Sequence, residues 1–402
     1  MNRNKKKIVV YLNSPSMCGG AQQIMVDVIN TLMDEFDFEI VTTNDHDDSD
    51  FNSKYSCDVS CPLTSFKLKR SSKYPEALNY LWKVPLCTIK YALYLRKRKP
   101  DISLSLIEME NIVNIFCAIL GINEKTVISL RVNPASPSYP IYLRIFYNVL
   151  MYLSRYFADL IIINSSDVKR LLVNKYNIDE TKIALIYNPK DIVSIQTRAS
   201  ESVSETFFST SDPIIITVGR LSNQKGHWHL IRVFAQIVKI TSAKLVICGD
   251  GPLRDYLTNL AIDLGVEKSV LFLGWCENPY KYINKSTVFV LSSLYEGLPN
   301  SLIEAIICGC PSISSDCKTG PSEVLEAGKY GLLTQNLDGI KYKASDPLSE
   351  SEIDLYNNIL RLLNDKKLQE NLKTLSYERA MYYDKKIRIQ EYAHEFNKIL
   401  NE

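Results

Sequence analysis

The sequence Pro213-Ile-Ile-Ile-Thr-Val-Gly219, continued by Arg220-Leu-Ser-Asn-Gln-Lys225-Gly226, decides the fold class. Its first part is an apolar, β-branched run, and Gly226 opens a helical pattern over 227–240. An apolar strand that leads through a glycine turn into a helix is typical of a parallel sheet covered by helices on both faces. The chain is therefore predicted to be an α/β protein.

Similar short apolar runs alternate with longer helical patterns along the whole chain, for example Asp159-Leu-Ile-Ile-Ile-Asn164. The expected strands of the first half are 8–13, 38–42, 102–107, 126–130, 160–164 and 183–187; those of the second half are 214–219, 244–249, 270–274, 287–292 and 312–315. At 402 residues the chain is long enough for two domains. Two parallel sheets, each with helices on its faces, are the expected architecture.

A stretch rich in serine and threonine between the two sets of strands predicts the domain boundary. We expect a Rossmann-like domain over 1–190, a linker over 191–212, a second Rossmann-like domain over 213–385 and a final helix over 386–402. Ligands usually bind in the cleft between two such domains, so a binding site is expected there.

The net charge of +2 excludes a globally basic nucleic-acid-binding protein. The charge is uneven, because residues 67–99 contain ten Lys or Arg but only one acid, Glu76, and are interleaved with tyrosine and tryptophan. A basic helix with an aromatic, apolar face is typical of contact with an anionic membrane surface, and 140–157 is a second aromatic-rich helix. The alternative is that both helices simply pack on the sheet. Single-stranded RNA also binds aromatic and cationic side chains, but the phosphate-binding motifs described below disfavour it.

The apolar runs are too short for the roughly 18 residues of a membrane span. The run Ile8 to Leu12 after the basic N-terminus suits a first strand better than a secretory signal. We therefore expect a cytoplasmic protein that is peripheral on the inner face of the membrane. The ten cysteines lack zinc-site spacing and are expected to be reduced thiols.

Two cations, Arg220 and Lys225, follow the first strand of the second half. At the carboxyl end of a parallel strand they suit a diphosphate, which arginine binds with a forked geometry and lysine as a point charge. Taken alone, such a loop is also compatible with simple solvation.

The segment Glu296-Gly-Leu-Pro-Asn-Ser-Leu-Ile-Glu304 follows the strand 287–292 and predicts a helix capped at Asn300 or Ser301. The amino end of a helix carries partial positive charge and favours a phosphate. Glu304 either compensates the helix dipole or accepts hydroxyl groups from a ribose. Glu296 precedes the helix, so helix stabilisation does not explain it.

Two more turns at strand ends contain glycine, namely Cys248-Gly-Asp-Gly-Pro252 and Lys318-Thr-Gly-Pro-Ser-Glu323. Each is weak evidence singly. Together the four turns are expected at one edge of one sheet, where open α/β sheets bind ligands. Their convergence predicts a phosphorylated ligand.

The motif set Gly-Arg-Leu-x3-Lys-Gly at 219–226, Gly-Asp-Gly-Pro at 249–252, Glu-Gly-Leu-Pro-Asn-Ser-x2-Glu-Ala at 296–305 and Gly-Pro-Ser-Glu at 320–323 resembles the retaining glycosyltransferases of family 4. The similarity is to bacterial enzymes of O-antigen, capsule and lipid-linked oligosaccharide assembly. It covers the C-terminal domain, and in the N-terminal half it rests on Cys18-Gly-Gly-Ala21. It implies the GT-B architecture, in which two Rossmann-like domains face a central cleft and the last helix crosses back to the N-terminal domain.

The resemblance also implies roles for single residues. Arg220 and Lys225 would hold the donor diphosphate and stabilise its charge as it leaves, Glu296 would face the transferred sugar, and Glu304 would bind the ribose. The other implied donor-binding residues are Gly19, Gly20, Gly219, Gly249, Asp250, Trp275, Leu298, Pro299, Asn300 and Ser301. No metal or cofactor is implied. UDP is the expected nucleotide, because 317–323 resembles relatives that use UDP-N-acetylhexosamines or UDP-galactose.

The acceptor side departs from the family pattern, because many relatives carry a histidine of the N-terminal domain near the donor sugar. The histidines of this chain are His46, His227, His229 and His394. The candidates for acceptor contact are Glu108 and Glu110 after the strand 102–107, and Arg131 and Asn133 after the strand 126–130. A lipid-linked saccharide is the expected acceptor, and surface polysaccharide biosynthesis the expected pathway. Proton transfer from the acceptor to the leaving phosphate is compatible with the lack of an assigned base.

Several alternatives use the same sequence features differently. A metal-dependent GT-A enzyme needs Asp-x-Asp, which Asp45-His-Asp47 and Asp48-Ser-Asp50 match within a polar run typical of a solvated loop. A dehydrogenase needs Gly-x-Gly-x2-Gly after a strand, which neither glycine turn provides. A GT-B-fold nucleotide-sugar epimerase and a non-catalytic sugar-nucleotide-binding partner of an assembly complex remain alternatives. The sequence predicts a hexosyltransferase that moves a hexose or N-acetylhexosamine from a UDP-sugar.

Overall fold

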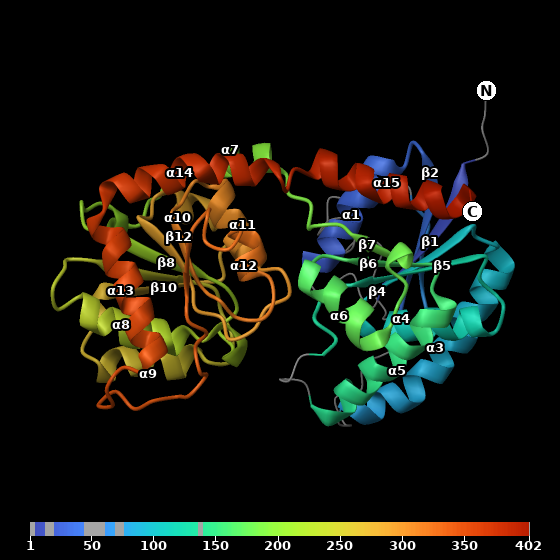
Figure 1. The fold of residues 1–402 in the computed structure, drawn as a ribbon, viewed down its shortest axis with the longest axis horizontal. Coiled ribbons are helices and arrows are strands. Elements are labelled where there is room, and N and C mark those ends of the chain that lie inside the picture. Colours follow the sequence, from blue (N-terminus) through green and yellow to red (C-terminus); the bar gives the residue numbers. More distant parts are fainter. Residues whose placement is uncertain (1–4, 13–19, 44–60, 69–75, 136–139, 402) are drawn as a thin grey trace. The chain divides into compact units, whose positions relative to one another are not determined.

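The computed structural model describes residues 5–12, 20–43, 61–68, 76–135 and 140–401 (Figure 1). The chain forms two compact units, one comprising Met1–Pro189 with Lys386–Glu402 and the other comprising Lys190–Lys385. Each unit is built on one parallel sheet with helices on its faces. The predicted α/β class with two Rossmann-like sheets is confirmed.

The first unit contains a seven-stranded parallel sheet of order β3-β2-β1-β4-β5-β6-β7. Its strands are β1 (Lys6–Leu12), β2 (Phe36–Thr42), β3 (Leu63–Ser65), β4 (Ile102–Leu106), β5 (Lys125–Leu130), β6 (Leu160–Ile163) and β7 (Ile183–Leu185). In register, Ile8 of β1 lies opposite Phe38 of β2 and Ile102 of β4. The chain builds outward from β1 in one direction and from β4 in the other, so the order reverses between these two strands.

Helices cover both faces of this first sheet. They are α1 (Gly20–Leu32), α3 (Glu76–Arg98), α4 (Glu108–Ile119), α5 (Ile141–Phe157), α6 (Ser166–Tyr176) and α15 (Lys385–Asn401). The buried side chains of β1 alternate, because Ile8 and Val10 belong to the core shared with α1 and α15, whereas Val9 and Tyr11 belong to the core shared with α3 to α6. A strand with apolar side chains on both faces can be buried only in such a three-layer arrangement.

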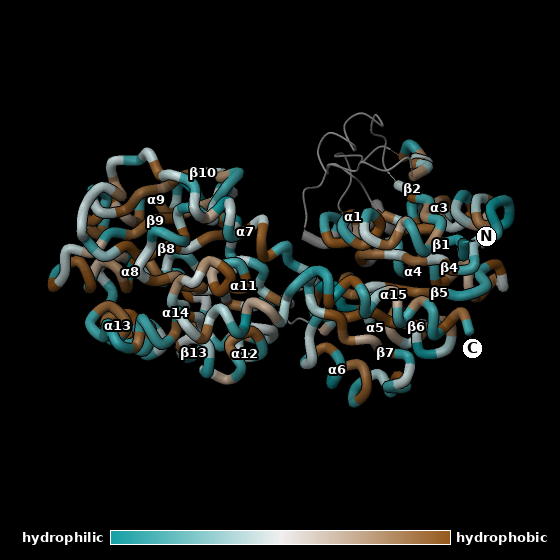
Figure 2. The backbone as a smooth tube through the Cα atoms, turned by 90° about the horizontal axis from the view of Figure 1, so that it is seen from above, coloured by the Kyte–Doolittle hydropathy of each residue, from teal (hydrophilic) through white to brown (hydrophobic). Residues whose placement is uncertain are grey.

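The second unit contains a six-stranded parallel sheet of order β10-β9-β8-β11-β12-β13. Its strands are β8 (Ile214–Val218), β9 (Lys244–Cys248), β10 (Val270–Gly274), β11 (Val288–Leu291), β12 (Ser312–Ser315) and β13 (Leu332–Thr334). The order reverses between β8 and β11, which pair through Val288 with Ile215 and Phe289 with Ile216. In Figure 2 hydrophobic stretches follow the strands of both sheets.

The helices of the second unit are α7 (Ile192–Ala199), α8 (His227–Ile237), α9 (Arg254–Asp263), α10 (Tyr280–Asn284), α11 (Asn300–Ile307), α12 (Pro321–Val324), α13 (Glu350–Asn364) and α14 (Lys366–Met381). One face of the sheet packs on α8, α9 and α13 through a core that includes Ile215, Val290 and Phe234. Burial of each such side chain contributes about 1.5–3 kcal/mol relative to exposure. This core fixes the strand ends that carry the predicted donor motifs.

The stretch 191–212, expected to be a linker, contains a helix. Helix α7 begins directly after Asp191, whose side chain accepts a hydrogen bond of 3.0 Å from the Ser194 amide. Ile192 and Ile195 are buried, and α7 packs against α10 of the second unit. Three-residue spacing of apolar side chains lets even a short polar segment bury one helical face, so this stretch belongs to the second unit.

Candidate active site

The predicted donor residues gather where the order of the second sheet reverses. Arg220 and Lys225 follow β8, whereas Glu296 follows β11. Because successive connections leave in opposite directions from these neighbouring strands, the loops at their carboxyl ends diverge, and ligands of open α/β sheets bind at such a point. The tertiary structure thus brings together two motifs that are about 70 residues apart in the sequence.

Lys225 and Glu296 form an ion pair, with 2.6 Å between Lys225 Nζ and Glu296 Oε1. The Ser293 hydroxyl donates to the same oxygen at 2.7 Å, and Gln224 Nε2 donates to Oε2 at 3.3 Å. The Glu296 side chain is only 8% exposed, so its charge needs these donors. Gln224 and Ser293 were not predicted as site residues, although Gln224 lies inside the motif that contains Lys225.

Arg220 differs from Lys225 in its surroundings. Its side chain is exposed, and within the described part of the chain it has no hydrogen-bond or ion-pair partner. An arginine held at a strand end without an internal partner keeps all its donors available for an oxyanion.

Close backbone packing joins the loops that follow β8, β9 and β10. The Leu221 amide donates to the Asp250 carbonyl at 3.0 Å, and the Gly249 amide donates to the Gly274 carbonyl at 2.7 Å. Gly249 has φ 144°, and a Cβ atom there would lie 2.0 Å from the Gly219 carbonyl oxygen. A side chain at Gly249 would therefore force these loops apart.

Two more of the predicted donor-binding residues, Asp250 and Trp275, lie on these same loops. Asp250 is exposed, and its Oδ1 accepts a hydrogen bond of 2.7 Å from the Gly251 amide. Trp275, directly after β10, is 75% exposed. An exposed indole ring at the sheet edge is available for stacking on a planar ligand.

Helix α11 begins after Pro299, which occupies the N-cap position without a side-chain cap. The expected cap at Asn300 or Ser301 is therefore wrong, and both residues lie in the first helical turn instead. Proline fixes the backbone before the helix, while the first-turn amides of any α-helix lack intrahelical acceptors. Leu298, which precedes this turn in the sequence, is buried. The uncapped amino end of α11 can thus accept an anion.

The turn after β12 supports the Glu296 loop from the other side. The Glu296 amide donates to the Lys318 carbonyl at 3.1 Å, and the Thr319 amide donates back to the Glu296 carbonyl at 3.1 Å. Gly320 has φ 97°, and a Cβ atom there would lie 2.2 Å from the Gly297 carbonyl oxygen. The Gly-Pro-Ser-Glu motif therefore holds the backbone of the Glu296 loop in place.

Glu304 lies in α11, and its Oε1 lies 2.5 Å from Lys190 Nζ. Both side chains are largely buried, with 17% of Glu304 and 13% of Lys190 exposed. Lys190 was not predicted as a site residue. Its only sequence signal is its place directly after the turn Asn188-Pro189, which says nothing of a contact with Glu304.

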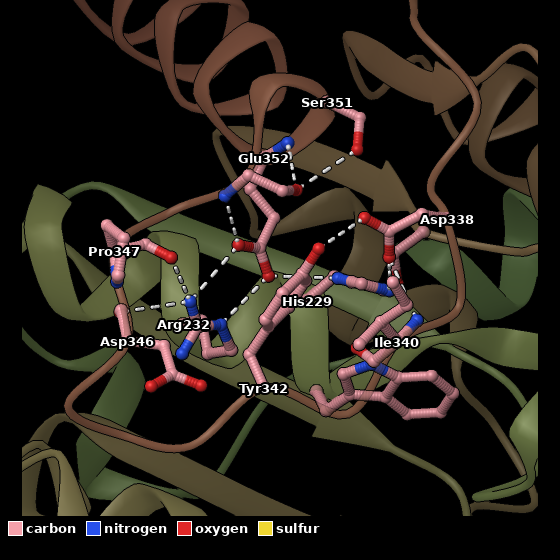
Figure 3. A network of polar contacts seen from close by, with 12 residues as sticks. His229, Arg232, Asp338, Ile340, Tyr342, Asp346, Pro347, Ser351 and Glu352 are labelled. Carbon is pink, nitrogen blue, oxygen red and sulfur yellow. Dashed lines mark hydrogen bonds and ion pairs between the residues drawn. The ribbon is translucent and has the colours of Figure 1, made fainter.

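A buried polar network lies between α8 and α13 (Figure 3). Glu352 Oε1 lies 2.9 Å from both His229 Nδ1 and Arg232 Nε, and all three side chains are at most 1% exposed. Glu352 Oε2 also accepts a hydrogen bond from the Ser349 amide, which closes the capping box of α13. These contacts satisfy the buried charges, so His229 and Arg232 serve the packing of the second unit.

The acceptor candidates of the first unit make contacts within that unit. Glu110 is fully buried in α4, and its Oε1 accepts a hydrogen bond of 3.2 Å from Thr43. The Arg131 guanidinium donates to Asn188 and to the Tyr392 hydroxyl of α15. Asn133 accepts a hydrogen bond from the Ala135 amide at 2.9 Å. The side chains of Glu110 and Arg131 thus form hydrogen bonds within the first unit, where strands and helices pack together.

The remaining predicted residues of the first unit are only partly described. Gly19 lies outside the described residues, and Gly20 is the first residue of α1. Glu108 begins α4, at the carboxyl end of β4. The order of the first sheet reverses between β1 and β4, so Gly20 and Glu108 both follow strands at that reversal.

Comparison with known proteins identifies the family. Residues 200–379 match the family model described as glycosyl transferases group 1. An uncharacterized glycosyltransferase of Methanocaldococcus jannaschii is 31% identical over 350 residues, which are 80% of this chain and 85% of that protein. The chain belongs to the group 1 glycosyltransferases. The resemblance seen in the motifs and the prediction of a transferase are therefore confirmed.

Other relatives extend the comparison over nearly the whole glycosyltransferase. An enzyme of Campylobacter jejuni, N-acetylgalactosamine-N,N'-diacetylbacillosaminyl-diphospho-undecaprenol 4-alpha-N-acetylgalactosaminyltransferase, is 29% identical over 91% of this chain and 93% of its own. The crystal structure of HepE from Anabaena in complex with UDP and glucose has a TM-score of 0.73 at 19% identity, covering 98% of this chain and 100% of that one. The predicted GT-B fold is confirmed.

Further findings bear on metals, membranes and cysteines. Among the described residues of the glycosyltransferase, His, Cys, Asp and Glu side chains form no group of three or more that would hold a metal ion. Asp45-His-Asp47 and Asp48-Ser-Asp50 lie outside those residues.

None of the described helices is both long and apolar enough to cross a membrane. The eight cysteines in the described part of the chain are free.

Proposed function

We propose that this glycosyltransferase moves a hexose or N-acetylhexosamine from a UDP-sugar to a lipid-linked saccharide, with retention of anomeric configuration. The observation that carries this proposal is the Lys225–Glu296 ion pair at the reversal of strand order in the second sheet. The same loops carry Arg220, whose side chain has no hydrogen-bond or ion-pair partner among the described residues, and the uncapped end of α11. Two cations, one carboxylate and a helix amino end provide a diphosphate site next to a sugar site.

The diphosphate would be bound by Arg220, Lys225 and the first-turn amides of α11. In the reaction the bond between sugar C1 and the diphosphate oxygen breaks, and a bond between C1 and the acceptor oxygen forms on the same face. The acceptor proton passes to the leaving diphosphate, so the step needs no protein base and no metal. Charge develops on the diphosphate as it leaves, and fixed cations stabilise this charge more than they stabilise the bound substrate.

The two glutamates would bind different parts of the donor, namely the transferred sugar and the ribose. Glu296 would accept hydrogen bonds from the hydroxyl groups of the transferred sugar, and its ion pair with Lys225 keeps sugar and diphosphate contacts in register. Glu304 would accept hydrogen bonds from the ribose. The Gly249–Asp250 turn and the exposed Trp275 would flank the base. Hydrogen bonds to charged groups contribute about 1.5–3 kcal/mol each, so these contacts discriminate strongly between donors.

A lipid-linked acceptor is supported by the name of the Campylobacter jejuni relative, which contains diphospho-undecaprenol. It is also supported by an exposed apolar stripe on α5, a helix without acidic residues. The side chains of this stripe recur at helical spacing on one face: Ile141, Ile145, Val149, Tyr152 and Tyr156. Arg144 and Arg155 flank the stripe, which suits the interface of an anionic membrane.

Helix α3 carries a similar stripe and packs beside α4, which in turn packs beside α5 (Figure 1). Trp82, Ile89 and Leu93 of α3 are 42–61% exposed. Some cations of the basic region 67–99 make internal contacts, since Arg98 pairs with Glu39 and Lys90 donates to the Phe66 carbonyl. Arg96, Lys97 and Lys99 are exposed. We therefore extend the proposed membrane-binding face from the basic region to α5.

The proposed reaction is tested by incubating the protein with UDP-sugars, with and without a lipid-linked acceptor extract, and with EDTA. Acceptor-dependent release of UDP that survives EDTA supports the proposal. Isomerisation of the UDP-sugar without acceptor would instead indicate an epimerase. Loss of activity with EDTA would indicate a metal-dependent mechanism. Binding of UDP-sugar without turnover would favour a non-catalytic partner of an assembly complex.

The membrane face is tested by co-sedimentation with anionic liposomes. Replacement of Ile145, Val149 and Tyr152 by serine should reduce the bound fraction severalfold, and so should neutralisation of the exposed Arg96, Lys97 and Lys99. Serine at Ile240 and Ile262 of the second unit, which are 63% and 54% exposed, is the matched control and should leave binding unchanged. Equal losses in the α5 variant and this control would contradict the assignment of the face.

A further inference from the structure

Lys190 reaches Glu304 from the point where the chain passes between its two units. The first segment of the first unit ends at Pro189, and Lys190 is the first residue of the second unit, to which Glu304 also belongs. The distance between Lys190 Nζ and Glu304 Oε1 is 2.5 Å. This places a buried ammonium group on the carboxylate to which the proposed function gives the donor ribose.

The backbone of Lys190 is fixed from both sides. Its amide donates to the Tyr383 carbonyl at 2.8 Å, and its carbonyl accepts from the Lys385 amide at 2.9 Å. These bonds form a parallel bridge between Lys190 and Asp384. The two passages of the chain between its units are thus hydrogen-bonded to each other at Lys190. A lysine with a fixed backbone and a largely buried side chain loses little additional conformational entropy when it holds a partner.

A carboxylate offers about four lone-pair positions on two oxygens. Lys190 occupies Oε1 of Glu304, and within the described residues no side chain or amide donates to Oε2. Glu304 keeps 17% of its side chain exposed. One oxygen is therefore held in place while the other remains available to the two neighbouring hydroxyl groups of a ribose.

We infer that Lys190 is a positioning residue for nucleotide recognition, which orients Glu304 toward the ribose 2′- and 3′-hydroxyls and thereby selects ribonucleotide donors. The inference rests on the proposed role of Glu304. Lys190 itself acts through the carboxylate and contacts neither the sugar nor the diphosphate. Ribose contacts are the same in ground state and transition state, so loss of Lys190 raises the KM for the donor and leaves kcat largely unchanged.

The experiment measures the Kd of UDP and of 2′,3′-dideoxy-UDP by calorimetry for the full chain and its variants. Lys190→Met should weaken UDP binding about tenfold, which corresponds to about 1.4 kcal/mol. It should leave the affinity for dideoxy-UDP unchanged. Lys190→Arg, which keeps a donor, should restore part of the loss. In the double variant Lys190→Met, Glu304→Gln the two losses of UDP affinity should not add, because both substitutions disrupt the same Lys190–Glu304 pair.

The matched control is Lys385→Met. Lys385 lies at the same crossing and pairs with Asp191 at 2.6 Å, but it does not contact Glu304. The Lys385→Met variant should bind UDP and 2′,3′-dideoxy-UDP as the wild type does. The inference is overturned if Lys385→Met weakens UDP binding as much as Lys190→Met does. It is also overturned if Lys190→Met leaves UDP binding unchanged, or weakens binding of both nucleotides equally.

The Glu304→Gln arm separates this inference from the proposed function. If Glu304→Gln no longer distinguishes UDP from dideoxy-UDP while Lys190→Met still does, Lys190 has no positioning role and the ribose role of Glu304 stands. If Glu304→Gln distinguishes them as the wild type does, the ribose role itself fails. A wild type that binds another nucleoside diphosphate in place of UDP overturns the proposed donor, and the same comparison with that nucleotide still tests Lys190.

Discussion

Lys225 Nζ and Glu296 Oε1 lie 2.6 Å apart, although the two residues are 71 positions apart in the sequence and follow different strands. The pair spans the reversal of strand order between β8 and β11. Each residue fixes the other, so the cation and the acid that would serve diphosphate and sugar are arranged before the donor binds. Such preorganisation lowers the cost of arranging charges during the reaction.

Replacement of one member of this pair should lower stability as well as activity. Glu296→Gln and Lys225→Met each leave the partner charge largely buried, which costs about 3 kcal/mol. The free energy of unfolding, measured with urea, should fall by that order in each single variant. The double variant Lys225→Met, Glu296→Gln should recover much of the loss, because it leaves neither charge unpaired.

Transfer activity should separate from stability in the same variants. Removal of a group that stabilises developing charge costs roughly a hundredfold or more in rate, and the double variant should stay inactive although its stability recovers. Lys329→Met is the control, since Lys329 forms exposed ion pairs with Glu326 and Glu378. Near-normal turnover of Glu296→Gln would contradict the proposed site.

Arg220 should affect activity without affecting stability. Its side chain is exposed and makes no hydrogen bond or ion pair within the described residues, so Arg220→Ala should change the free energy of unfolding by less than about 0.5 kcal/mol. UDP release in the presence of acceptor should fall by roughly a hundredfold. Arg220→Lys should recover only part of the lost activity, because an ammonium group lacks the forked geometry of a guanidinium. A large loss of stability in Arg220→Ala would show that the residue is structural.

Gly320→Ala should disrupt the Glu296 loop. The new Cβ atom would lie 2.2 Å from the Gly297 carbonyl oxygen and 2.8 Å from Pro299 Cδ, in a backbone conformation with φ 97°. We expect a loss of about 3 kcal/mol in stability together with loss of UDP binding. Gly121→Ala is the control, because Gly121 has φ 63° but open space around its Cα; it should cost only about 1 kcal/mol and leave UDP binding intact. Equal effects would show that backbone strain alone, and not the contact with Gly297, matters.

Burial of His227 should make stability fall in mild acid. Burial, aided by the charge of Lys225, lowers the pKa of His227 to about 3. The unfolded chain takes up a proton below pH ~6.5, whereas the folded protein resists protonation down to that lower pKa, so the stabilisation is complete above pH ~6.5 and is lost as the pH falls. Between pH 6.5 and 5 the loss from this group is about 2 kcal/mol.

Urea unfolding at pH 7 and pH 5 measures this dependence. His227→Leu removes the titrating group, so its stability should change less between the two pH values than that of the wild type. A wild type and a His227→Leu variant with the same pH dependence would contradict the assignment. The acids with lowered pKa values, such as Glu352, lose their contribution to stability only at lower pH. They therefore affect the wild type and the His227→Leu variant alike.

Eleven strands are predictable from their apolar runs, and the structure has all of them within one or two residues of the expected bounds. Strands β3 (Leu63–Ser65) and β13 (Leu332–Thr334) were missed, because three-residue strands at a sheet edge are too short to leave a periodic signal. Helix α7 was missed because its polar composition outweighed the spacing of Ile192 and Ile195. Long apolar runs report burial on both faces, whereas edge elements depend on neighbours that lie far away in the sequence.

The two-sheet architecture, the loops that carry the donor motifs and the family could all be predicted from the sequence, because apolar periodicity and glycine turns are local properties of the chain. Which charges meet depends on the tertiary structure. It paired Lys225 with Glu296 and Lys190 with Glu304, and it engaged Glu110 with Thr43 and Arg131 with Tyr392. Strand order and the crossing of the chain between its units set these contacts, and neither is encoded in any single segment.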